Sequence, residues 1–284
     1  MKNVCLLVFT VMLIGFCSAQ TQKKVTVRYK TEENVPEKRH SLDIYRAKGG
    51  DRPVVIFVHG GGWLLGDKDN KITNKVKVFS ELNYVFVSVN YRLSSFFSKK
   101  TQYPEHPNDV ADAVLWTFQN IGKYGGDRNK IVLMGHSAGA QMVSLLGTSE
   151  RFLPERGIQL NKIKGVISLD TEGYDVYGLG MENVNIYRRI FGDVPKIWKD
   201  ASPLYQVEQG KQYPPFLIAW RGESFRKSMA ENFAQKLRNS GTTAETFSAE
   251  PYSHFEVNNK FGAPDDEIVT PRVLGFLKEI FAER

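Results

Sequence analysis

KIVLMGHSAGAQMVSLL, residues 130–146, joins an apolar run to a helix-forming run through one serine that stands between two glycines. KIVLM is typical of a strand covered on both faces, and AGAQMVSLL is typical of a helix. Glycines on either side of Ser137 allow a tight strand-to-helix turn, which leaves the hydroxyl exposed near the helix N-terminus. The stretch therefore predicts a nucleophile elbow in an α/β protein.

Similar short apolar runs recur along the chain, with helical stretches between several of them. The other runs are PVVIFVHG (53–60), YVFVSVNY (84–91), KGVISLD (164–170), PPFLIAW (214–220) and TAETFSAE (243–250). Helical spacing is clearest in NDVADAVLWTFQNIGKYGG (108–126) and SMAENFAQKLRNSG (228–241), and both stretches end at glycine. Strands that alternate with helices predict a mostly parallel, doubly wound sheet with helices on both faces. KVTVRYK (24–30) and HSLDIYRA (40–47) alternate in polarity, which predicts an antiparallel edge.

Residues 1–19 have the pattern of a secretory signal peptide. Lys2 gives a basic start, an apolar run follows, and small residues precede an expected cleavage after Ala19. Lipidation at Cys17 and an uncleaved anchor are the alternatives, but the apolar run is too short to span a bilayer comfortably. We therefore expect a secreted or periplasmic protein without stable membrane insertion, and a single domain over residues 20–284. Because Cys5 and Cys17 both lie in the leader, no disulfide is expected in that domain.

The charge of the chain does not indicate a nucleic-acid partner. The net charge is +7, but the basic residues are spread along the sequence without a long basic block or a recognisable binding module. We expect a solvated basic surface, and the sequence gives no indication of oligomeric state.

A glycine turn, His59-Gly60-Gly61-Gly62-Trp63, directly follows the run PVVIFV. Consecutive glycines expose backbone N–H groups and let a ligand approach closely, so this turn can form an oxyanion hole together with the N–H of Ala138. Gly61 and Gly62 are the preferred donors, although the sequence leaves open which glycine N–H points inward.

Two long insertions interrupt the alternation of strands and helices, one near 92–106 and one at 171–207. Both follow strands at the side where ligand crevices form in open α/β sheets, so we expect cap-like or lid-like walls of a cleft. Their aromatic residues either line that cleft or anchor the loops to the core. The residues concerned are Phe96, Phe97, Tyr174, Tyr177 and Trp198.

Taken together, HGGGW, NYRL, YPEHPNDVADAV, YGGDRNKIVLMGHSAGA and FGDVPKIWKDASP resemble the α/β-hydrolase superfamily. They look most like its HGGG-type esterase branch, which includes carboxylesterases, feruloyl and acetyl-xylan type esterases, and kynurenine formamidase-like enzymes. The resemblance covers nearly all of the chain after the leader. It implies an eight-stranded α/β-hydrolase sheet and a catalytic triad in the chain order Ser, acid, His.

The resemblance assigns the base to His254, in PYSHFEV after the last strand, because the other four histidines fall at unsuitable positions. His136 lies in the elbow, with its side chain expected to point away from the partners of Ser137. Two residues are candidates for the acid. Glu223 follows the last strand but one, which is the usual station in the family, and is preferred; Asp170 ends the strand before it and is the rival.

We therefore predict a secreted serine hydrolase that cleaves carboxylic esters with small acyl groups through an acyl-enzyme, with Ser137, His254 and Glu223 as its triad. Acetyl or feruloyl esters of polysaccharides are the substrates that an exported location favours. Nucleophile, base and oxyanion donors complete this mechanism, so neither a cofactor nor a metal is expected. The alternatives are an arylformamidase-like amide hydrolase and a catalytically inactive binding protein with the same fold.

Overall fold

The computed structural model describes residues 24–182, 184–222 and 224–282. These residues form one eight-stranded sheet with the order β1-β2-β4-β3-β5-β6-β7-β8. The strands are β1 (Lys24–Arg28), β2 (Ser41–Tyr45), β3 (Arg52–Val58), β4 (Val85–Val89), β5 (Gly126–His136), β6 (Ile163–Leu169), β7 (Phe216–Trp220) and β8 (Ala244–Ser248). β2 runs antiparallel to both β1 and β4, and the strands from β4 across to β8 are parallel.

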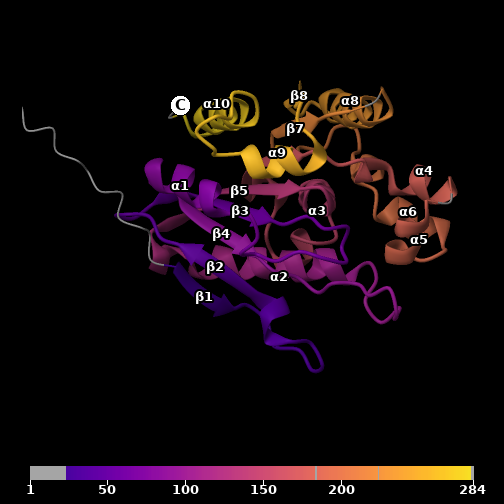
Figure 1. The fold of residues 1–284 in the computed structure, drawn as a ribbon, viewed down its shortest axis with the longest axis horizontal. Helices are drawn as coiled ribbons and strands as arrows, with labels where there is room; N and C mark the ends of the chain where they lie inside the picture. The colour runs from indigo at the N-terminus through magenta and orange to yellow at the C-terminus, as the bar shows by residue number, and fades with distance from the viewer. Residues whose placement is uncertain (1–23, 183, 223, 283–284) are drawn as a thin grey trace, which may run out of the picture.

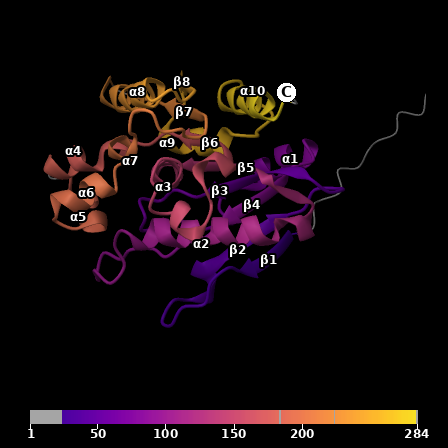
Figure 2. The ribbon, with the colours of Figure 1, turned by 180° about the vertical axis from the view of Figure 1, so that it is seen from behind.

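Helices cover both faces of the sheet (Figures 1 and 2). The α-helices are α1 (Thr73–Glu81), α2 (Glu105–Asn120), α3 (Ala138–Leu146), α4 (Val176–Met181), α5 (Asn185–Phe191), α6 (Pro195–Asp200), α7 (Pro203–Gln206), α8 (Ser224–Asn239), α9 (His254–Lys260) and α10 (Val269–Phe281). Short 3₁₀ turns lie at η1 (Glu37–His40), η2 (Ile121–Tyr124), η3 (Pro154–Arg156), η4 (Leu160–Lys162) and η5 (Gly173–Asp175).

The predicted α/β-hydrolase architecture is confirmed: every predicted strand is present, and the antiparallel edge is formed by β1 and β2. One boundary prediction was wrong. The glycine pair at 125–126 was expected to end a helix, but α2 already ends at Asn120. Gly125 ends the 3₁₀ turn η2 in a left-handed conformation, and Gly126 begins β5. The backbone of Gly126 approaches its neighbours closely, since a Cβ there would lie 2.7 Å from the side chains of Ile121 and Val54.

Two hydrophobic clusters, one on each side of the sheet, hold these layers together. The first packs α2, α3 and α8 against the sheet, with Val114, Met142 and Phe233 fully buried. The second packs α1, α9 and α10 against the other side, with Phe79 and Phe261 fully buried. Burial of the strands on both faces explains why their sequences are continuous apolar runs rather than alternating ones.

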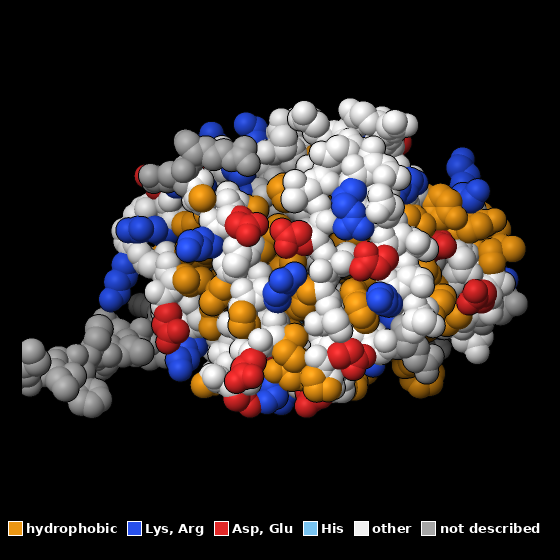
Figure 3. Space-filling model, turned by 90° about the horizontal axis from the view of Figure 1, so that it is seen from above, with side chains coloured by type: hydrophobic (Ala, Val, Ile, Leu, Met, Phe, Trp, Pro, Cys, Tyr) orange, Lys and Arg blue, Asp and Glu red, His pale blue; other side chains and the backbone are white. Residues whose placement is uncertain are grey.

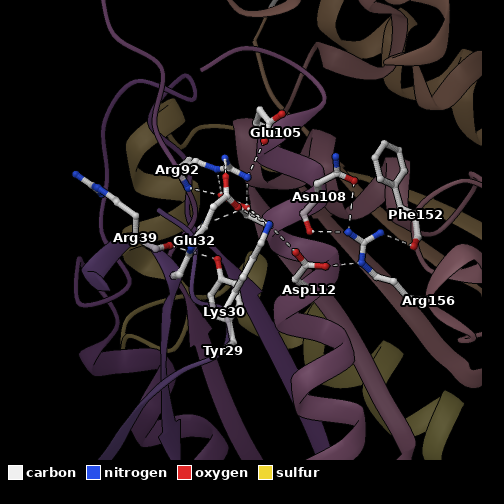
Figure 4. A network of polar contacts seen from close by, with 12 residues as sticks. Tyr29, Lys30, Glu32, Arg39, Arg92, Glu105, Asn108, Asp112, Phe152 and Arg156 are labelled. Carbon is white, nitrogen blue, oxygen red and sulfur yellow. Dashed lines mark hydrogen bonds and ion pairs between the residues drawn. The ribbon is translucent and has the colours of Figure 1, made fainter. Parts of the chain in front are cut away.

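A charged network ties the segment after β1 to α2 and to the loop after β4 (Figure 4). Arg92 donates two hydrogen bonds to the fully buried carboxylate of Asp109, at 2.8 and 2.7 Å. Lys30 lies 3.1 Å from Asp112, and Arg156 donates to the same carboxylate at 2.6 Å. Because each buried or half-buried carboxylate faces a cation, the cost of removing these charges from water is offset.

Helices α4 to α6 form a lobe at one end of the molecule (Figures 1 and 2), built from the second predicted insertion. Tyr174 and Trp198 are buried there and anchor the insertion to the core. The first insertion packs on this lobe, because Arg189 donates a 3.0 Å hydrogen bond to the carbonyl of Ser95. Phe97 is 99% exposed, so its aromatic ring anchors nothing.

The surface seen in Figure 3 carries Lys and Arg side chains intermixed with Asp and Glu, in line with basic residues that are spread along the sequence. No helix among the described residues is long and apolar enough to cross a membrane. The predicted leader, residues 1–19, lies outside the described residues.

Candidate active site

Ser137 lies at a sharp turn between β5 and α3. Its φ of 55° and ψ of −121° are an unusual conformation for a residue with a side chain, and such strain is held in place by tight packing. The flanking glycines provide that packing. A Cβ on Gly135 would lie 2.3 Å from the carbonyl oxygen of Gly139, and a Cβ on Gly139 would lie 2.1 Å from that of Val58. Any larger residue at either position would therefore displace the elbow.

The imidazole of His254 points towards the hydroxyl of Ser137. Its Nε2 atom lies 2.9 Å from Ser137 Oγ. His254 is the first residue of α9, and a capping box fixes this helix start: Ser253 Oγ accepts from the N–H of Glu256, and the Glu256 carboxylate accepts from the N–H of Ser253. The two residues that the sequence pairs as nucleophile and base are thus in hydrogen-bond contact.

The carboxylate on the far side of His254 belongs to Asp170, the rival candidate. Asp170 Oδ2 lies 2.6 Å from His254 Nδ1, and the residue is 1% exposed. The preferred acid, Glu223, lies outside the described residues, and we correct the assignment to Asp170. The physical reason is the sheet order: Asp170 follows β6, the immediate neighbour of β5, and the N–H of Ser137 donates to the carbonyl of Leu169 at 3.0 Å. The end of β6 is therefore held directly beside the elbow.

Two carboxylates that follow Asp170 in the sequence, Glu172 and Asp175, have other partners. Glu172 forms an ion pair with Arg226 at 2.7 Å, and Asp175 caps α4 by accepting from the N–H of Gly178 at 2.8 Å. Neither carboxylate contacts His254.

Two arginines share the carboxylate of Asp170 with the histidine. Arg221 Nε donates to Oδ2 at 2.9 Å, and Arg226 Nη1 lies 3.5 Å from Oδ1. Burial opposes the ionisation of Asp170, but the hydrogen bond and charge of His254, the charge of Arg226 and the hydrogen bond from Arg221 outweigh it and lower the pKa of this carboxyl. Asp170 is therefore an anion over the neutral pH range.

His136 also contacts the base, contrary to the prediction that its side chain points away. Its Nε2 lies 2.8 Å from the backbone oxygen of His254, so Nε2 carries the proton and donates. The two rings lie 4.6 Å apart. Burial, followed by the charge of His254, lowers the pKa of His136 to about 3, so the ring is neutral at neutral pH. The elbow motif contains this histidine but gave no signal of its contact with His254, because β8 and α9 are distant in sequence.

The glycine turn lies against the elbow. A Cβ on Gly60 would lie 2.9 Å from that of Ser137, so only glycine allows this approach. Gly61 and Gly62 have φ values of 116° and 61°, which favour glycine. In the described part of the chain the N–H groups of Gly61, Gly62 and Ala138 donate no hydrogen bond, so they are free to bind an oxyanion.

His59 supports the turn rather than the chemistry. It is 4% exposed and stacks on Tyr91 with a ring separation of 4.4 Å, while the Tyr91 hydroxyl donates to the His59 carbonyl at 3.0 Å. Burial lowers the pKa of His59 to about 4, so the imidazole is neutral. These contacts fix the start of the glycine turn.

Two hollows meet at Ser137. The larger is a cleft of about 490 Å³, whose polar walls include Asn70, Lys71, Asn258 and Asn259. The smaller has a volume of about 170 Å³. It is lined by Gly62, Trp63, Ser137, Ala138, Thr171, Glu172, Ile186, Tyr187, Arg226 and His254. The second insertion therefore does form a wall, but through Ile186 and Tyr187 rather than the aromatic residues proposed from the sequence.

One acidic group among the described residues has the spacing of a metal site. Glu32, His40 and Asp109 place ligand atoms within 4.8 Å of one another. However, Arg92 lies 2.5 Å from Glu32 and 2.7 Å from Asp109, and Lys30 lies 2.8 Å from Glu32. These cations already neutralise both carboxylates, which argues against a divalent ion at this place.

The chain is similar in sequence to known esterases. The BD-FAE family model matches residues 42–226. Esterase LipQ of Mycobacterium tuberculosis is 29% identical over 231 residues, which is 75% of this chain and 53% of that protein. Esterase LipC of the same organism is 28% identical over 69% of this chain and 52% of its own length, so the chain spans about half the length of these curated relatives.

The fold is also found among solved structures. A structure of Thermogutta terrifontis esterase 2 superposes with a TM-score of 0.73 at 21% identity, covering 93% of this chain and 98% of that chain. At this identity the match concerns the α/β-hydrolase fold alone.

Proposed function

The chain belongs to the BD-FAE family, and on this premise we propose that it is a carboxylic ester hydrolase that acts through a serine acyl-enzyme. The observation that carries the proposal is the hydrogen-bonded series Ser137–His254–Asp170, with distances of 2.9 and 2.6 Å. The names of LipQ and LipC as esterases support the reaction class.

In the proposed mechanism, Ser137 Oγ attacks the ester carbonyl while His254 Nε2 takes its proton. The carbonyl oxygen becomes an oxyanion, which accepts from the free N–H groups of Gly61, Gly62 and Ala138. The tetrahedral intermediate expels the alcohol, which takes the proton from His254, and an acyl-serine remains. Water then attacks the acyl-serine with His254 again as base, releases the carboxylic acid and restores Ser137.

Asp170 gives this sequence its electrostatic support. It holds the imidazole so that Nδ1 is protonated and Nε2 faces the serine, and its negative charge stabilises the imidazolium in both transition states. Because Asp170 is buried and ionised, the interaction operates in surroundings where water screens it little.

We further assign a small acyl group, such as acetyl, to the smaller hollow and the alcohol to the larger cleft. The larger cleft has several amide side chains, which suit the hydroxyls of a polysaccharide-linked alcohol. A bulky acyl such as feruloyl would instead have to occupy the larger cleft.

We also propose that the protein is exported after cleavage following Ala19, on the basis of its leader pattern. N-terminal sequencing of the exported protein tests this, and a chain that does not begin at Gln20 would contradict it.

The experiment that tests the function is a substrate panel on the purified protein: acetyl, butyryl and feruloyl esters, together with N-formylkynurenine. We expect turnover of the acetyl ester above that of the feruloyl ester, and its loss in Ser137→Ala. Preferential turnover of N-formylkynurenine would indicate an arylformamidase-like enzyme. No turnover of any compound would indicate a binding protein and would refute the proposal.

A further inference from the structure

The loop after β7 brings positive charge to the catalytic acid. In the α/β-hydrolases that the sequence resembles, the catalytic acid usually follows this strand. Among the described residues of this loop and the first turn of α8, Arg221 and Arg226 contact the site. Asp170 comes instead from the end of β6, across the β6–β7 pairing. The segment after β7 therefore supplies two arginines that contact Asp170, at the end of the neighbouring strand β6.

The contacts on Asp170 occupy both of its oxygens. Oδ2 accepts from His254 Nδ1 at 2.6 Å and from Arg221 Nε at 2.9 Å, and Oδ1 lies 3.5 Å from Arg226 Nη1. Glu172 in turn holds the other nitrogen of Arg226 at 2.7 Å. Asp170 itself has a φ of 50°, a strained value that its side-chain contacts help to hold.

We propose that Arg221 and Arg226 are positioning residues: they clamp the carboxylate of Asp170 in the orientation that receives His254 Nδ1–H. The proposal rests on the proposed function, because it concerns the same triad. Neither arginine needs to touch the substrate for this role, although Arg226 also reaches the smaller hollow.

The charges around Asp170 and His254 predict how Arg221 and Arg226 affect the pH dependence of kcat/KM. The titratable and charged groups around Asp170 and His254, among the described residues, are His136 from β5, Tyr174 from η5, Arg221 after β7, and Arg226 from α8 with its partner Glu172. His136 is neutral, and both arginines favour the ionised form of Asp170: Arg226 acts through its charge and Arg221 through its hydrogen bond. Loss of either contact therefore raises the pKa of Asp170 and moves the pH at which the carboxylate loses its charge upward.

Arg221→Ala tests the clamp, because the side chain is only partly buried and the guanidinium can be replaced from solvent. With p-nitrophenyl acetate we expect kcat to fall about tenfold, the size of one lost hydrogen bond to a charged group, with KM within about twofold. The acidic limb of kcat/KM should move to higher pH, and millimolar guanidinium chloride, compared with sodium chloride, should restore kcat. Arg226→Gln should give a smaller fall, because its contact with Asp170 is longer.

Arg128→Ala is the matched control, since Arg128 is exposed at the opposite end of β5 and packs on Phe118. It should leave kcat, pH profile and guanidinium response unchanged. If Arg221→Ala keeps the wild-type kcat, the proposed positioning role is wrong. A fall in kcat without a pH shift and without rescue by guanidinium would also contradict it, because such a fall indicates a merely structural role.

An NMR readout separates failure of the clamp from failure of the proposed function. The Nδ1 proton of His254, shared with Asp170, is expected as a downfield resonance in the wild type that shifts or broadens in Arg221→Ala. If the wild type hydrolyses no ester, the function fails while this resonance still tests the clamp; an unchanged resonance in the variant would overturn the clamp alone.

Discussion

At the scale of single residues, the site depends on the carboxylate of Asp170, which follows β6, whereas the acid was expected after β7. Asp170 is 1% exposed and lies 2.6 Å from His254 Nδ1, so no other described carboxylate competes for this contact. The position of the acid therefore decides the orientation of the base.

Asp170→Asn tests this assignment. We expect kcat to fall about 10³- to 10⁴-fold, because an amide at this position selects the wrong imidazole tautomer while leaving the fold intact. Glu223→Gln should keep activity within about twofold of the wild type if Asp170 is the acid. Steady-state kinetics with p-nitrophenyl acetate measures both. A large loss of kcat in Glu223→Gln with little loss in Asp170→Asn would instead identify Glu223 as the acid.

Sequence reasoning could reach Ser137 and His254 because short-range patterns carry them: a strand, a glycine-flanked turn and a helix for one, and a position after the last strand for the other. It could not choose the acid. Asp170 and Glu223 both follow buried strands, and only the three-dimensional contact with His254 separates Asp170 from its rivals. Likewise, nothing local to the elbow indicates that His136 donates to the His254 backbone.

At the scale of elements, the strand-to-helix turn depends on the closeness of its backbone to β3. A Cβ at position 139 would lie 2.1 Å from the carbonyl oxygen of Val58, so α3 would have to move away from the sheet. The strands and helices themselves were predictable, since their apolar patterns are strong. The α4–α6 lobe was predicted only as an insertion, because its helices are short. The sequence also does not indicate whether its aromatic side chains point into the core or into the cleft.

Gly139→Ala tests the element scale. We expect the free energy of unfolding to fall by about 2 kcal/mol and kcat to fall with it, because the added methyl group forces the backbone apart. Gly275→Ala is the control: it lies in α10, where a Cβ meets nothing within 4 Å, and should stabilise the protein by about 0.4–1 kcal/mol. Urea denaturation measures both variants, and equal stabilities would show that the predicted clash is relieved without cost.

At the scale of the whole molecule, the charged network around Asp109 joins the N-terminal edge of the sheet to α2. Burial opposes the charge of Asp109, but hydrogen bonds from His40 and Arg92 outweigh it and lower the pKa of this carboxyl to about 2. A depressed folded-state pKa contributes stability that is present above the unfolded value, near 4, and is lost as pH falls towards about 2.

Asp109→Asn should lower the free energy of unfolding at pH 7 by about 3 kcal/mol, because it leaves Arg92 half-buried without its main partner. The variant should also lose less stability than the wild type between about pH 4 and pH 2, since the group that titrates there is gone. Asp265→Asn, at an exposed ion pair with Lys260, is the control and should match the wild type. Identical pH dependence of the wild type and Asp109→Asn would contradict this role.

The central claim is that Ser137 is a nucleophile activated by His254 and Asp170. The most direct test is reaction with a fluorophosphonate ester followed by mass spectrometry of the intact chain and its peptides. The structure predicts one adduct per chain, on Ser137, formed rapidly in the wild type, much more slowly in Asp170→Asn and His254→Ala, and absent in Ser137→Ala. An adduct on another residue, or equal labelling rates in the wild type and His254→Ala, would contradict it.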